Sequence, residues 1–69
     1  MFDERKFRAV LALQGVKLQD VAVLLGINEA TLYRKIRRGG DFSREEINKL
    51  IKALDIKDPA SIFFTEKLA

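Results

Sequence analysis

The apolar residues of this chain recur at helical spacing along nearly all of its 69 positions, and glycines divide the pattern into short segments. Residues three and four positions apart share one face of an α-helix, so each segment has one face to bury. The glycines at positions 15, 26, 39 and 40 follow such segments, where a residue that tolerates the left-handed conformation ends a helix. The sequence has no stretch with the alternation of a β-strand. It therefore predicts an all-α fold.

Three helices are predicted before the glycine pair. The first follows Asp3 and Glu4, whose negative charges suit the N-terminal end of a helix dipole. The second covers residues 17–25, and the third runs from an N-cap at Asn28 to about Arg38. The predicted core residues of these helices are Phe7, Val10, Leu11, Leu18, Val21, Ala22, Leu25, Leu32 and Ile36, and Gln14 shares the helix face of the first three.

The segment DFSREEI, residues 41–47, predicts the start of a fourth helix. Ser43 and Glu46 have the spacing of a capping box, in which each residue satisfies a backbone N–H of the other. Phe42 and Ile47 have the spacing of a hydrophobic staple. The predicted buried stripe of this helix is Ile47, Leu50, Ile51 and Leu54.

A short fifth helix is predicted from Asp58-Pro59, which has the pattern of an N-cap followed by proline at the first helical position. It would return Ile62 and either Phe63 or Phe64 to the core. All the phenylalanines, at positions 2, 7, 42, 63 and 64, are expected in the core. The last five residues, TEKLA, are expected to fray.

Composition argues against most catalytic and metal-binding chemistry. The chain has no His and no Cys, which removes the usual general base, the usual ligands of zinc, copper and iron, and any disulfide. Its length predicts a single domain over residues 1–69, too small to enclose a pocket of acidic side chains. No apolar run approaches the roughly 20 residues of a membrane span. We therefore expect a non-enzymatic, cytoplasmic protein with no cofactor, metal, membrane or small-molecule ligand.

Positive charge is concentrated upstream. The chain holds 13 Lys and Arg against 10 Asp and Glu, and residues 1–40 hold eight of these cations with four of the acids. The densest cluster is Arg34, Lys35, Arg37 and Arg38. Leu32 and Ile36 set the core side of the third helix, so Arg34 points almost directly away from the core. No acid in that half of the helix pairs with the cations. The cluster is either a solvated helix end favoured by the helix dipole or a face that meets a polyanion.

The segment LQDVAVLLGINEATLYRKI, residues 18–36, resembles the helix-turn-helix of phage Cro and repressor proteins and their bacterial relatives. Ala22 is the small residue where the two helices cross, and Gly26 is the turn glycine. Apolar residues of the motif are matched by Val21, Leu25, Ile27 and Leu32. SREEINKLIKALDI is similar to the fourth helix of that family, and DPASIFF to its fifth. The resemblance implies a compact five-helix domain of the lambda-repressor-like type, with the motif at about residues 17–38.

By this resemblance the third helix is the recognition helix that enters the DNA major groove. The candidate base contacts are Glu29, Ala30, Tyr33, Arg34 and Arg37. The candidate phosphate contacts are Lys17, Lys35, Arg38 and Ser43. Arg34 would bind guanine O6 and N7, Glu29 would accept from cytosine N4, and Ala30 would meet a thymine methyl group.

Three positions depart from the family pattern. Leu18 stands where many members carry a polar residue, often Gln, that binds phosphate, and its place on the helix predicts burial instead. Ile36 lies one residue later than the usual apolar position, which would rotate the basic end of the recognition helix. Val23 lies off its core face, as Leu13 does on the first helix. Val23 and Leu13 are each either a single exposed apolar residue or a contact with a second copy or with the tail.

The resemblance implies sequence-specific binding of double-stranded DNA by a small transcription regulator of the phage or mobile-element type, acting by operator occupancy. Members commonly bind palindromic operators as homodimers, and a monomer stays open at this length. The alternative is a protein-interaction module on the same fold, such as an antirepressor or an antitoxin. The basic outer face argues against it, because protein interfaces are depleted of Lys at their cores.

Overall fold

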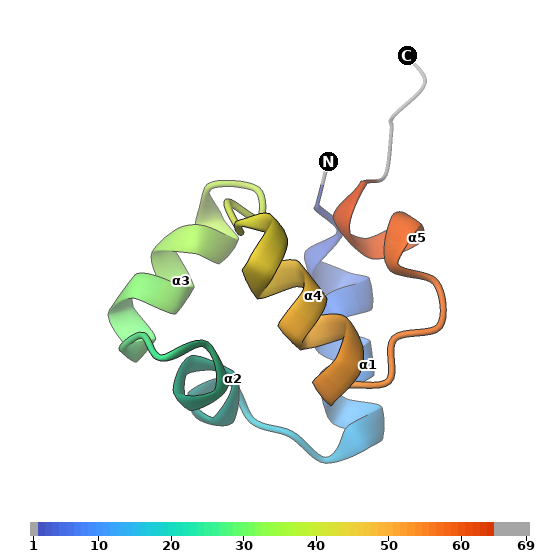
Figure 1. The fold of residues 1–69 in the computed structure, drawn as a ribbon, viewed down its shortest axis with the longest axis horizontal. Helices are drawn as coiled ribbons and strands as arrows, with labels where there is room; N and C mark the ends of the chain where they lie inside the picture. Colours follow the sequence, from blue (N-terminus) through green and yellow to red (C-terminus); the bar gives the residue numbers. More distant parts are fainter. Residues whose placement is uncertain (1, 65–69) are drawn as a thin grey trace.

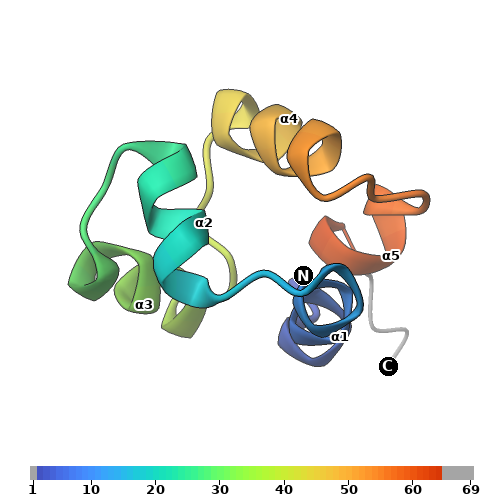
Figure 2. The same cartoon turned by 90° about the horizontal axis from the view of Figure 1, so that it is seen from below.

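The computed structural model describes residues 2–64, and five α-helices account for most of them (Figure 1). They are α1 (Glu4–Gln14), α2 (Leu18–Leu25), α3 (Glu29–Arg37), α4 (Arg44–Ala53) and α5 (Pro59–Phe63). Figures 1 and 2 show α2 and α3 together at one end of the molecule and α1 and α5 together at the other. Accordingly, α2 packs against α3 and α4, and α1 packs against α5. The prediction of an all-α, five-helix fold is confirmed.

The helix boundaries follow the local signals in the sequence closely. Asp3 caps α1 by accepting a hydrogen bond from Lys6 N at 3.0 Å. Ser43 and Glu46 form the predicted capping box, with Glu46 N donating to Ser43 Oγ at 3.1 Å and Ser43 N donating to Glu46 Oε1 at 2.9 Å. Lys17 is the N-cap of α2 rather than its first residue. The predicted bounds were therefore correct to within one residue at these ends.

The start of α5 differs from the prediction in its chemistry. Pro59 occupies the first turn as predicted, and Asp58 occupies the N-cap position. The Asp58 side chain makes no capping hydrogen bond, however. Its backbone carbonyl instead accepts a hydrogen bond from Ser61 Oγ at 3.0 Å. Asp58 is therefore the N-cap residue of α5 without a capping side-chain hydrogen bond, and the side-chain hydrogen bond at this helix start comes from Ser61.

Four phenylalanines form one aromatic cluster, in which three rings are buried and Phe42 is partly buried. They are Phe2, Phe7, Phe42 and Phe63, and the six distances between their ring centroids lie between 5.3 and 6.4 Å. These residues come from the N-terminal segment, α1, the α3–α4 connection and α5. Aromatic pairs at such distances add to the stabilisation from burial. The cluster therefore joins segments from both ends of the described chain.

One predicted core position is wrong, and one buried residue was missed. Phe64 is exposed, because it follows the last turn of α5 and Phe63 takes the inward position. Gln14 is also exposed, at the end of α1. Ile56 is buried, although it lies in the connection between α4 and α5, outside any periodic segment. Leu18 is partly buried against the core, as its helical position predicted.

Two further expectations concern the membrane and the tail. None of the helices formed by residues 2–64 is both long enough and apolar enough to cross a membrane. The predicted fraying of residues 65–69 lies outside the described residues.

Candidate nucleic-acid interface

A tight turn sets α3 against α2. Gly26 ends α2 with a φ of 69°, a left-handed conformation that glycine adopts without a steric penalty. Ile27 N then donates to Ala22 O at 3.0 Å. Asn28 starts α3 by accepting a hydrogen bond from Thr31 N at 2.8 Å. The small, buried side chain of Ala22 lets the two helices pack closely. The turn is thus held by hydrogen bonds on both sides.

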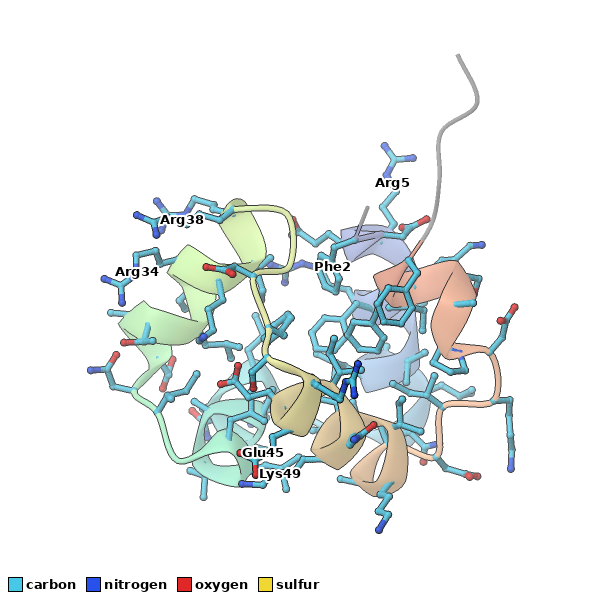
Figure 3. The ribbon with its side chains drawn as sticks, turned by 45° about the horizontal axis from the view of Figure 1, so that its top comes forward. Phe2, Arg5, Arg34, Arg38, Glu45 and Lys49 are labelled. Carbon is cyan, nitrogen blue, oxygen red and sulfur yellow. The ribbon has the colours of Figure 1, made fainter. Side chains whose placement is uncertain are left out.

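The outer face of α3 is free of the core. Leu32 and Ile36 are buried on its inner side. All the candidate base contacts are exposed: Glu29, Ala30, Tyr33, Arg34 and Arg37. Figure 3 shows Arg34 and Arg38 projecting from α3 away from the rest of the molecule. Neither of them forms an ion pair with any residue from 2 to 64. The exposed cations of this helix are therefore available to an external anion.

Lys35 differs from its basic neighbours. Its Nζ lies 3.3 Å from Glu46 Oε1 and donates to the Asp41 carbonyl at 3.2 Å. Within residues 29–37 no acid pairs with these cations, as expected, but Lys35 has an acidic partner outside its helix. The partner comes from α4, eleven residues further along the chain. Of the other candidate phosphate contacts, Lys17, Arg38 and Ser43 are exposed.

A polar cleft of about 230 Å³ lies beside the basic end of α3. Its lining residues are Thr31, Arg34, Lys35, Arg38 and Asp41. Three cationic side chains and a hydroxyl group in one cleft offer hydrogen-bond donors to an anion such as a phosphate. Asp41 is the one acid in this lining.

A second cleft, of about 420 Å³, lies where α1 and α2 approach the start of α3. It brings Arg8 and Gln19 beside Lys17, Glu29 and Tyr33. Sequence reasoning did not select Arg8 or Gln19. Gln19 follows Leu18 directly, so it places a polar side chain in the first turn of α2, where the family pattern expected one. Arg8 belongs to another helix, so nothing in the local sequence indicates its closeness to Tyr33.

The surroundings of Glu46 perturb its ionisation. Its partial burial raises the pKa, but the hydrogen bond from Ser43 N, together with the hydrogen bond and charge of Lys35, outweighs burial. The pKa of Glu46 is therefore lowered, and the carboxylate is ionised at neutral pH. Across residues 2–64 no cluster of three or more acidic side chains could hold a metal ion.

Comparison with known proteins gives one match. The family model described as "Cro/C1-type HTH DNA-binding domain" matches residues 6–66, which is most of the chain. No curated protein and no solved structure matches the sequence. The matched segment includes the turn at Gly26, the exposed face of α3 and both clefts.

Proposed function

The chain belongs to the Cro/C1-type helix-turn-helix DNA-binding family, which is not enzymatic, and on that premise we propose that it is a sequence-specific transcription regulator. It binds a double-stranded operator and acts by occupying it. The regulator is of the phage or mobile-element type, works in the cytoplasm, and binds a palindromic operator as a homodimer. The observation that carries the proposal is the exposed basic face of α3, beside a turn that holds this helix at the edge of the molecule.

In this proposal α3 lies in the major groove, which is wide enough to admit one α-helix. Arg34 donates to O6 and N7 of a guanine, a bidentate contact that other bases do not offer. Glu29 accepts from cytosine N4, and Ala30 contacts a thymine methyl group. Tyr33 and Arg37 lie on the same exposed side and reach neighbouring bases or the backbone.

Phosphate contacts flank the helix. Arg38 lies one turn beyond Arg34, and Lys17 lies at the start of α2, where backbone N–H groups also favour an anion. Ser43 stands at the start of α4. Contacts of this kind fix the position of a protein on the duplex without reading the sequence.

The experiment has two stages. Selection of bound duplexes from a random pool identifies the operator and shows whether it is palindromic. Wild type and Arg34→Ala are then titrated with the selected operator, with its single-base variants and with random duplex at fixed salt. We expect Arg34→Ala to lose about 1–3 kcal/mol on the operator, and much less on random duplex. Arg34→Lys should restore only part of the loss, because Lys lacks the planar fork of Arg.

The matched control is Lys57→Ala, which removes a cation from the connection between α4 and α5, away from α3 (Figure 1). It should bind both kinds of duplex as the wild type does. An equal loss on every duplex in Arg34→Ala would make Arg34 a phosphate contact. If the wild type binds no duplex at low salt, the protein-interaction alternative replaces the proposed function.

A further inference from the structure

Lys35 connects three parts of the chain. Its ammonium group donates to the Asp41 carbonyl at 3.2 Å and pairs with Glu46 Oε1 at 3.3 Å. Its backbone carbonyl accepts from Gly40 N at 3.0 Å and from Asp41 N at 3.1 Å. The side chain and the main chain of one residue thus hold the end of α3, the α3–α4 connection and the start of α4 together.

Glu46, the partner of Lys35, also makes several hydrogen bonds. The same oxygen, Oε1, accepts from Ser43 N at 2.9 Å and from Lys35 Nζ at 3.3 Å. The capping box fixes the Glu46 side chain at the start of α4, because Glu46 N also donates to Ser43 Oγ. Lys35 therefore pairs with a carboxylate whose position is already set by α4.

The Lys35–Glu46 pair differs from the other ion pairs in residues 2–64. Its side chains are 22% and 17% exposed, whereas those of Arg8–Glu4 are 48% and 46% exposed and those of Lys57–Asp55 are 82% and 69% exposed. Fully exposed pairs contribute little, because solvent screens them and long side chains lose entropy. A partly buried pair with further hydrogen bonds holds a more defined geometry.

The connection that this pair spans contains two glycines, and it is also held by backbone hydrogen bonds and by the packing of Gly40 against Phe2. Gly39 and Gly40 both have positive φ values, 78° and 79°, and glycine has the widest conformational freedom of any residue. Two glycines restrict the direction of the chain little by themselves, so the angle between α3 and α4 depends on the contacts around them. The ion pair is such a contact, and it acts between the basic end of α3 and the capped end of α4.

We propose that Lys35 is a positioning residue of the DNA-binding face: it sets the end of α3 against the start of α4, and it does not contact phosphate. The part of this proposal that is tested by DNA binding rests on the proposed function. The proposal replaces the sequence-based expectation that Lys35 is a phosphate contact, and it leaves that role in this cluster to Arg38. Arg34 and Arg38 then hold a constant spacing from the start of α4.

Two variants and their combination test the proposal. Lys35→Met removes the ammonium and keeps the aliphatic stem. Glu46→Gln keeps the capping box, which accepts Gln as well as Glu, and removes only the charge that faces Lys35. Each single variant should lose on the order of tenfold in the ratio of operator to random-duplex affinity, and the double variant should lose no more than either single one. Lys35→Arg, which can still reach Glu46, should retain most of the ratio.

The dependence of affinity on salt separates positioning from phosphate contact. Each phosphate that a cation neutralises contributes about −0.9 to the slope of log affinity against log salt concentration. The slope should be unchanged in Lys35→Met and flatter by about 0.9 in Arg38→Gln. Lys57→Met, which breaks an exposed ion pair, should change neither the ratio nor the slope.

Two outcomes would overturn the proposal. Lys35→Met could flatten the slope and weaken binding equally on every duplex, which would make Lys35 a phosphate contact. Glu46→Gln could instead raise affinity and steepen the slope, which would mean that Glu46 only masks Lys35. Amide hydrogen exchange of the free protein adds a readout that needs no DNA: Lys35→Met should speed exchange at Gly40 and Asp41. A wild type without operator preference would refute the proposed function, while this exchange result would still decide the positioning role.

Discussion

Gly40 is the residue at which the connection after α3 meets the N-terminal segment. Its φ is 79°, and a Cβ built on it would overlap the Cβ and ring of Phe2. Gly39 has nearly the same φ, 78°, but a Cβ there would meet nothing within 4 Å. Gly39 is therefore favoured by its backbone conformation alone, whereas Gly40 is favoured by its backbone conformation and by the lack of room beside Phe2.

We predict that Gly40→Ala destabilises the fold more than Gly39→Ala does. Both substitutions place a side chain in the left-handed region, which costs about 1–2 kcal/mol. Gly40→Ala adds overpacking against Phe2, which costs roughly another 1–3 kcal/mol. Urea unfolding of both variants measures the difference in the free energy of unfolding. Equal destabilisation would show that the Phe2 ring moves aside without loss.

At single positions, sequence reasoning succeeded where a residue acts through its own helix. The core side of α3 followed from Leu32 and Ile36, and the exposure of Arg34 followed from them. It failed where the deciding contact comes from elsewhere. The pairing of Lys35 with Glu46 was not predicted, because Glu46 lies in another helix. Nothing in the spacing of the two residues reveals that α3 and α4 meet there.

At the start of α4, the ionisation of Glu46 is coupled to folding. The pKa of Glu46 is lowered from its ordinary value of 4.5, so the folded state holds this proton less tightly than the unfolded chain does. The stabilisation is fully present above that ordinary value, and it is lost as the pH falls through the lowered one. Acidification should therefore weaken this end of α4.

We predict that Glu46→Gln flattens the pH dependence of stability. The variant keeps the capping geometry but has no titrating group at this position. Its free energy of unfolding should fall less than that of the wild type between about pH 6 and pH 3. Denaturant unfolding at several pH values measures both curves. Parallel curves would contradict the assignment of this stabilisation to Glu46.

For whole helices, the sequence predicted where a helix begins better than where it ends. Asn28 and Ser43 cap their helices as predicted. Asp3, predicted only as a charge that the helix dipole favours, also caps α1. The end of α5 is different, because two adjacent phenylalanines offer the same apolar character. The packing of α5 against α1 and the contacts of Phe63 with the other rings of the aromatic cluster select Phe63 over Phe64 for the core.

At the scale of the molecule, the charge is distributed unevenly over the fold. The net charge is only +3. Within residues 2–64, three cations are paired with Glu4, Glu46 and Asp55. Arg34 and Arg38 project freely at the end of the molecule formed by α2 and α3 (Figure 3). The cluster itself was visible in the sequence. The smaller cleft, beside this cluster, is lined by residues 31–41 of one continuous segment. The larger cleft, at the start of α3, was not visible in the sequence, because it combines residues of α1 and α2 with Glu29 and Tyr33, which only the tertiary fold brings together.

This distribution predicts how salt affects binding by the whole molecule. If Lys17 and Arg38 meet phosphates on either side of α3, each bound chain releases counterions from both places. Affinity should then fall steeply as salt rises, on operator and on random duplex alike. Lys17→Gln and Arg38→Gln should each flatten the slope by about 0.9, and the double variant by about 1.8, because the two sites neutralise separate phosphates.

Lys57→Gln removes one cation from the opposite side of the fold and should leave the slope unchanged. Titrations at four or more salt concentrations measure all five proteins. A slope that flattens equally in Lys57→Gln would mean that net charge, rather than the surface around α3, governs the attraction to DNA.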